Sequence, residues 1–101
     1  MLKRTFAAAV MLACVPLAHA DDFCQKMSQT ASVAMSARQD GVPLRDLIAS
    51  VRSKNGGKEQ PYEPMIFEAY KRPLVQGKEA KTTAATEFGN ETYMVCMKKM
   101  K

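Results

Sequence analysis

Apolar residues recur at helical spacing in four stretches of the chain, which turn-forming residues separate. In the first stretch, Asp21 or Asp22 suits the start of a helix, where negative charge is favoured. Asp40-Gly41 suits its end, because glycine readily takes the left-handed conformation that closes a helix. The polar side chains that fall largely on other faces are Ser28, Ser32, Ser36 and Arg38. The apolar face consists of Phe23, Met27, Ala31, Ala34 and Met35.

Two shorter helices are predicted in the middle of the chain. Pro43 suits the first turn of the second helix, because the N–H that proline lacks is not needed there, and Asn55-Gly56-Gly57 ends this helix. The third helix begins near Pro61 or Pro64 and stops before Pro73, whose ring clashes with a continuing helix. The stripe of the second helix is Leu44, Leu47, Ile48 and Val51. The stripe of the third is Tyr62, Met65, Ile66, Ala69 and Tyr70.

The last segment, Lys78 to Lys101, also has a helical pattern, which Gly89-Asn90 interrupts. It forms either one kinked helix or two shorter helices. One side of it carries Ala80, Ala84, Phe88, Val95 and Cys96. No stretch of the sequence alternates with period two for long enough to predict a strand. The pattern therefore predicts an all-α fold, a small bundle of four helices, or of five if the last segment divides.

The N-terminus has the three parts of an export signal. Lys3-Arg4 supply positive charge, the run from Phe6 to Leu12 is apolar, and Ala18-His19-Ala20 is typical of a cleavage site. The apolar run is shorter than the roughly 20 residues that a permanent membrane helix needs. We therefore predict a signal peptide at 1–20, a single helical domain at 21–101, no stable membrane insertion and a periplasmic or secreted location.

Removal of the signal peptide would leave two cysteines, Cys24 and Cys96, because Cys14 would be lost. In an oxidising compartment an even number of cysteines favours a disulfide, and here only one intramolecular pairing exists. A bridge between these residues closes nearly the whole domain, which the chain-entropy model values at up to about 4.4 kcal/mol. A reactive thiol is the alternative, but no histidine remains to activate it and no CxxC spacing is present. We predict a disulfide that joins the first and last helices.

Composition narrows the classes of function. The chain has 101 residues, with 15 basic and 10 acidic side chains and a formal net charge of +5. Cleavage would remove the only histidine, His19, and with it histidine-based acid–base chemistry. The basic residues form only short clusters, which argues against a nucleic-acid partner. We expect that the protein is not an enzyme and that it binds no cofactor. We also expect three carboxylates to be solvated on the surface, namely Glu59, Glu63 and Glu68.

Methionine is unusually frequent, with eight in the chain. Three of them recur at every third position near the C-terminus: Met94, Met97 and Met100. Thioethers suit Cu(I), but at this spacing they span an arc of about 120° on a helix and cannot all converge on one ion without further ligands. We therefore favour gap-filling or an adaptable contact surface, and keep a Cu(I) site at these three residues as the minority hypothesis.

Four sequence features together resemble a loose group of short exported bacterial proteins of unknown function. They are Cys24 in a first helix, Ala34 to Arg38 running into Gly41, Ala69-Tyr70 before Pro73, and Phe88 to Tyr93 before Cys96. The resemblance implies a periplasmic or secreted helical domain in a Gram-negative bacterium. In architecture alone the chain is also similar to the acid-stress periplasmic chaperones, which are small exported helical proteins with one disulfide.

These observations favour a non-enzymatic exported module that binds a protein or a component of the cell envelope. Two alternatives stay open: an acid-stress chaperone, and a protein that binds a small ligand or Cu(I). The contact surface is expected where aromatic and methionine side chains reach the outside of the bundle. The candidate contact residues are Tyr62, Phe67, Tyr93, Met97 and Met100.

Overall fold

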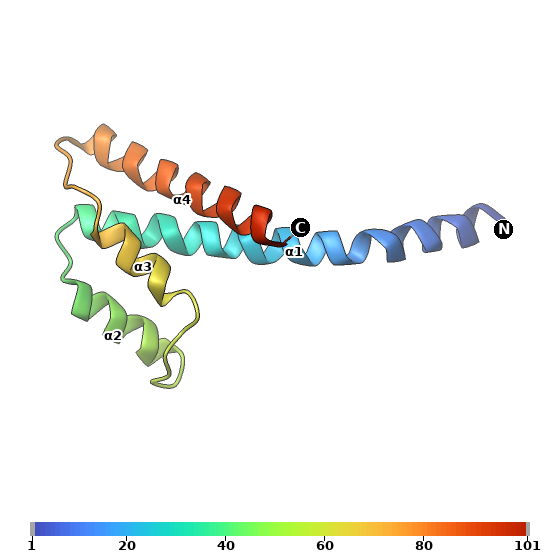
Figure 1. Cartoon of the computed structure of the whole chain (residues 1–101), viewed down its shortest axis with the longest axis horizontal. Helices are drawn as coiled ribbons and strands as arrows, with labels where there is room; N and C mark the ends of the chain where they lie inside the picture. The colour runs from blue at the N-terminus through green and yellow to red at the C-terminus, as the bar shows by residue number, and fades with distance from the viewer. Residues whose placement is uncertain (1, 101) are drawn as a thin grey trace.

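The computed structural model describes the backbone of residues 2–100 and the side chains of residues 21–100. The side chains of the predicted signal peptide and Lys101 lie outside the described part. The all-α prediction is confirmed, and the described chain forms four α-helices (Figure 1). These helices are α1 (Leu2–Gln39), α2 (Leu44–Lys54), α3 (Glu63–Tyr70) and α4 (Lys78–Met100). Among the described residues, no helix is both long enough and apolar enough to cross a membrane.

The first helix is longer than its apolar pattern predicted. It starts at Leu2 and runs for 38 residues, so that its N-terminal part projects beyond the other helices (Figure 1). The prediction that Asp21 or Asp22 caps its start is therefore wrong for the full chain. The physical reason is that the alanine-rich segment before these aspartates has high helix propensity and continues the helix.

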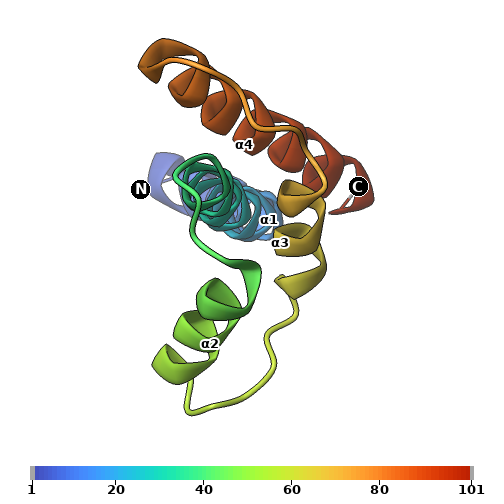
Figure 2. The ribbon, with the colours of Figure 1, turned by 90° about the vertical axis from the view of Figure 1, so that its left-hand side faces the viewer.

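The last helix is a single element without a break at Gly89-Asn90. It runs in the opposite direction to the second half of α1 (Figure 1) and crosses it obliquely (Figure 2), and the disulfide Cys24–Cys96 joins the two helices as predicted. Small residues spaced by four positions face each other between the helices. The Ser28 hydroxyl donates to the Gly89 carbonyl (2.9 Å) and the Ser32 hydroxyl to the Ala85 carbonyl (3.1 Å). Gly89 therefore does not interrupt α4 but allows it to approach α1.

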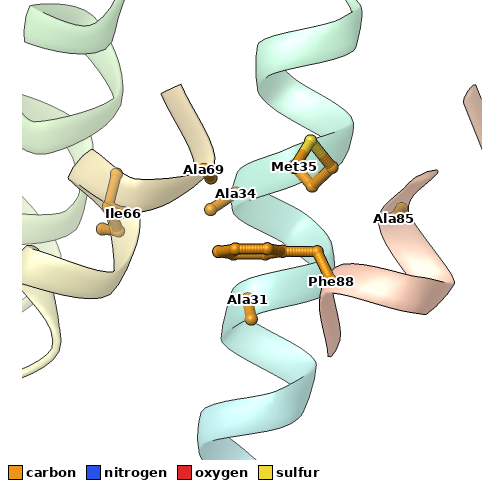
Figure 3. Close-up of a cluster of buried hydrophobic side chains, with 7 residues drawn as sticks. All are labelled: Ala31, Ala34, Met35, Ile66, Ala69, Ala85 and Phe88. Carbon is orange, nitrogen blue, oxygen red and sulfur yellow. The ribbon is translucent and has the colours of Figure 1, made fainter. Parts of the chain in front are cut away.

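These contacts correct the predicted helix faces. Ser28 and Ser32 lie on the side of α1 that meets α4, not on a separate polar face. On α4 the buried side chains include Ala85, whereas Ala80 and Val95 are exposed. The core consists of seven side chains from α1, α3 and α4 (Figure 3), namely Ala31, Ala34, Met35, Ile66, Ala69, Ala85 and Phe88.

The second helix packs on the outside of this core. None of its residues is fully buried, and its apolar stripe (Leu44, Leu47, Ile48 and Val51) is only half-buried against the cluster. An ion pair also links α2 to α3. The Nε and Nη2 groups of Arg52 donate to the two carboxylate oxygens of Glu63 at 2.9 and 2.6 Å. The expectation that Glu63 is a solvated charge is wrong, because this side chain is only 2% exposed.

The connection from α3 to α4 is tied to the end of α1 by a buried glutamine. The Gln39 amide donates to the Pro73 carbonyl (3.0 Å), and its oxygen accepts from the Val75 N–H (2.9 Å). Beyond Gln39 the chain turns through Gly41, whose φ of 84° is the left-handed conformation predicted for the end of this helix. These bonds hold α3 beside α1 and set where α4 begins.

Candidate binding groove

An open groove of about 670 Å³ lies between α3 and the second half of α4, with α1 contributing part of its lining. It exists because the helices differ in length. At 1.5 Å per residue, the 8 residues of α3 span about 12 Å and the 23 residues of α4 about 35 Å. Proline residues at 61 and 64 bracket the start of α3, and Pro73 follows its end. The short α3 leaves the last turns of α4 uncovered.

Large apolar side chains gather in this groove although they are exposed to solvent. Phe23 on α1 is 49% exposed, and on α4 Met94, Val95 and Met100 are 57%, 54% and 48% exposed. All four line the groove. An exposed apolar patch with charged residues around it is typical of a site that binds a partner.

Methionine is the prominent residue type of the groove. The fold brings together Met27 of α1, Met65 of α3, and Met94 and Met100 of α4. An unbranched thioether side chain with three rotatable bonds adapts its shape to whatever packs against it. Such a lining suits an apolar ligand surface without demanding one fixed shape.

Three charged residues of the groove, Glu68, Arg72 and Glu91, belong to ion pairs, and Lys71 pairs with Glu68 from outside the lining. The Arg72 guanidinium joins α3 to α4 by donating to Glu91 at 2.9 Å, and it lies 4.9 Å from the centre of the Phe88 ring. The Lys71 ammonium donates to Glu68 at 2.8 Å, and this hydrogen bond holds the pKa of the Glu68 carboxyl below its ordinary value. Within each pair the charges compensate each other.

Two lysines in the last turn of α4 add positive charge to the groove. Lys98 and Lys99 both line it, and neither forms an ion pair within the described part of the chain. Their position also suits the helix, because positive charge is favoured at a helix C-terminus. The net charge of the groove is therefore positive beside its apolar lining.

The candidate contact residues from the sequence do not form one surface. Tyr62 and Met100 line the groove, whereas Met97 is half-buried and is not part of the lining. Tyr93 is half-buried and donates its hydroxyl to the Asp21 carboxylate, a hydrogen bond that raises the pKa of Tyr93. Phe67 is 42% exposed and lines a separate hollow against α2.

The groove also contains residues that the sequence pattern assigned elsewhere. Phe23 and Val95 fit the periodicity of buried faces, and nothing local distinguishes them from core residues. The same periodicity predicts core positions for Met27 and Met65. Their shared role depends on how α1, α3 and α4 are arranged, which a single-helix pattern does not contain.

The minority hypothesis of a Cu(I) site requires metal ligands that lie close together. Among the described residues, no group of three or more histidine, cysteine, aspartate or glutamate side chains could hold a metal ion. Met94 and Met100 line the groove, but Met97 between them does not. The three methionines of the Cu(I) hypothesis therefore do not all line the groove.

Comparison with protein-family models, with curated proteins and with solved structures finds no significant match to this chain.

Proposed function

We propose that this protein is a non-enzymatic exported binding module that holds a partner protein of the cell envelope in the groove between α3 and α4. The observation that carries the proposal is the exposed apolar lining, to which Phe23, Met94, Val95 and Met100 contribute from two helices. Burial of such a patch by a partner gains free energy in proportion to the apolar area removed from water.

Two further features support the proposal. A disulfide between Cys24 and Cys96 fits an oxidising compartment outside the cytoplasm, and the first 20 residues have the pattern of an export signal. The methionines give the groove an adaptable lining, which is the property of surfaces that bind protein segments.

Site-specific cross-linking in producing cells tests this function. A photo-reactive amino acid replaces Met100 in the groove, and in a second strain it replaces Val33 on α1, which is 63% exposed and does not line the groove. We expect the Met100 position to form a discrete complex with another protein, which mass spectrometry then identifies. The Val33 position is expected to form no such complex.

A matched pair of substitutions links this complex to the groove. Val95→Glu places a charge in the apolar lining and is expected to abolish the complex, whereas Val33→Glu makes the same change at a similarly exposed helical position outside the groove and is expected to preserve it. The same complex from both cross-linking positions, or a complex insensitive to Val95→Glu, would overturn the proposal.

A second candidate function is acid-stress protection of other proteins, and the ion pair between Arg52 and Glu63 favours it. Acid that protonates Glu63 removes this contact between α2 and α3. The released α2 would expose the apolar stripe of Leu44, Leu47, Ile48 and Val51. The decisive measurement is protection of an acid-sensitive client enzyme from aggregation at low pH, and no protection would exclude this function.

A further inference from the structure

We propose, building on the proposed function, that the segment held in the groove is an amphipathic helix with acidic residues beside its apolar face. The groove is lined by residues of α3 on one side and of α4 on the other and is open to solvent, so a third helix can lie along α4. From Phe88 to Met100, α4 rises about 18 Å, which equals about 12 residues of a docked helix. A helix of that length presents apolar anchors at i, i+3, i+4 and i+7.

The charge of the groove selects the polar residues of this helix. Arg72 is compensated by Glu91, and Glu68 is compensated by Lys71, which leaves the positive charges of Lys98 and Lys99 without an ion-pair partner in the described part. An occupant with Asp or Glu next to its apolar anchors places negative charge opposite these lysines. An occupant with Lys or Arg there would meet like charge.

The position of the two lysines also predicts the direction of the docked helix. Lys98 and Lys99 lie in the last turn of α4. In an occupant antiparallel to α4, the residues opposite this turn belong to its own first turn. Acidic residues there stabilise the positive end of the occupant's dipole and pair with the lysines at the same time. We therefore expect the acidic residues in the N-terminal turn of the occupant.

An open groove is less suited to a lipid tail. Sites for small ligands usually bury most of the ligand surface, whereas a helix needs only one face covered. Positive charge at Lys98 and Lys99 would also attract an anionic membrane surface. Binding to vesicles of anionic phospholipid is therefore measured beside peptide binding, to separate these two partners.

Selection from a randomised library of helical peptides tests the inference without assuming a natural partner. The purified full chain is the target, and a second selection uses the charge-reversed variant Lys98→Glu/Lys99→Glu. We expect the wild-type protein to enrich peptides with Asp or Glu in the first turn beside an apolar stripe. We expect the variant to enrich Lys or Arg at the same positions, an exchange that a partly unfolded variant would not produce.

The selected peptides then give the size of the effect by fluorescence anisotropy. Lys98→Glu/Lys99→Glu is expected to weaken binding of the acidic peptides about tenfold, since reversing two exposed charges is worth roughly 1.4 kcal/mol. The control Lys78→Glu/Lys81→Glu makes the same change of net charge at the other end of α4, away from the groove. It is expected to leave affinity within about twofold.

Several outcomes would overturn the inference. The first two are a selection that enriches no peptides and a selection whose peptides show no charge preference. The other two are equal affinity of the selected peptides for the wild type and for the Val95→Glu variant, and binding to anionic vesicles in place of peptides. The proposed function has its own test in the cross-linking experiment. If the Met100 position captures a partner but acidic helices do not bind, this inference fails while the proposed function stands.

Discussion

At Gly89 the backbone of α4 lies against α1 with no room for a methyl group. A Cβ built there would lie 2.3 Å from the Ser32 hydroxyl oxygen and 3.1 Å from the Ser28 carbonyl oxygen. The hydroxyl can rotate away, but it then loses its bond to the Ala85 carbonyl, and the Ser28 oxygen belongs to the helix backbone. Glycine has a low helix propensity, but at this position it is favoured because only a residue without a Cβ fits against α1.

Gly89→Ala is therefore expected to lower the free energy of unfolding. Overpacking costs about 1–3 kcal/mol, and better helix propensity returns about 1 kcal/mol, so the expected net loss is up to about 2 kcal/mol. Urea denaturation followed by circular dichroism measures it. The exposed neighbour offers the control Asn90→Ala, expected to stay near wild-type stability. A Gly89→Ala protein as stable as the wild type would contradict the close contact.

Gln39 supplies a second prediction at the scale of a single residue. Its amide is buried and bonds to Pro73 and Val75 in the connection before α4. Gln39→Ala leaves two backbone groups without partners and is expected to cost about 1–3 kcal/mol in the same denaturation experiment. The exposed Gln29 on the same helix provides the control Gln29→Ala. Equal stability of the two variants would show that these bonds do not hold the connection.

The two cysteines of the disulfide could be predicted from the sequence, but the burial of Glu63 and its ion pair could not. Cys24 and Cys96 are the only cysteines beyond residue 20, so a single pairing exists among them. The partner of Glu63 is Arg52, eleven residues earlier and on the other side of a loop. No periodic pattern connects a carboxylate at the start of one helix with a guanidinium near the end of another.

At the scale of elements, α2 is the helix with the weakest attachment to the core. Its stripe is half-buried, and its polar contacts to α3 lie at its two ends. The Tyr70 hydroxyl donates to the Val42 carbonyl (2.7 Å) just before α2, and Arg52 binds Glu63 near its end. Burial raises the pKa of Tyr70, so this donor keeps its proton at neutral pH.

Acid is expected to release α2 before the rest of the bundle. The hydrogen bonds from Arg52 hold the pKa of Glu63 below its ordinary value, and the N–H of Gln60 (2.8 Å) acts in the same direction. Because the folded-state pKa is lowered, the contribution to stability is present above the unfolded value of about 4.3 and disappears as the pH falls through the folded value. Another charged group, Glu59, lies near the pair, and its negative charge contributes to raising the pKa of Arg52.

Hydrogen exchange at decreasing pH measures this release. Amides of residues 44–54 should lose protection at a higher pH than amides of α4. Glu63→Gln should weaken protection of α2 already at neutral pH and flatten its pH dependence. The exposed Glu87 on α4, which forms no ion pair in the described part of the chain, provides the control Glu87→Gln. Loss of protection in α2 and α4 at one common pH would contradict the separate release of α2.

The elements themselves followed largely from local sequence. The second helix was expected after Pro43 and before Asn55, and it spans Leu44–Lys54. The third was expected to stop before Pro73 and ends at Tyr70. The prediction for the last segment left one helix or two, and the structure has one, because Gly89 is packed against α1. Local signals thus define most helix ends, whereas contacts between helices decide whether a glycine interrupts one.

At the scale of the whole molecule, the disulfide closes the antiparallel pair of α1 and α4. Cys24 and Cys96 are separated by 72 positions in sequence, so the bridge restricts nearly all of the domain in its unfolded state. A bundle of this size is marginally stable without such a restriction. Cys96 also lines the groove, so the bridge keeps the last turns of α4 beside α1, where the groove is formed.

Cys24→Ser/Cys96→Ser is expected to lose most of this stabilisation, up to about 4.4 kcal/mol in the chain-entropy model. Thermal unfolding with and without a reducing agent measures it. The wild-type melting temperature should fall on reduction, and that of the double variant should not change. A wild-type protein whose melting temperature is unaffected by full reduction would contradict the role assigned to the bridge.

The sequence by itself determined the all-α class, most helix ends and the disulfide pairing. Helix ends depend on the backbone preferences of individual residues such as Gly41 and Pro73, and the pairing follows from there being only two cysteines beyond residue 20. The predicted signal peptide also rests on sequence alone. These are properties of short segments or of composition, which folding does not rearrange.

Only the tertiary structure decided which apolar faces stay uncovered. Phe23 and Val95 have the spacing of core residues, yet they are exposed because the eight-residue α3 does not reach the end of α4. The burial of Glu63 likewise depends on α2 bringing Arg52 to it. Burial is a property of what packs against a residue, and that neighbour is far away in sequence. The groove therefore belongs to the arrangement of the helices and not to any one of them.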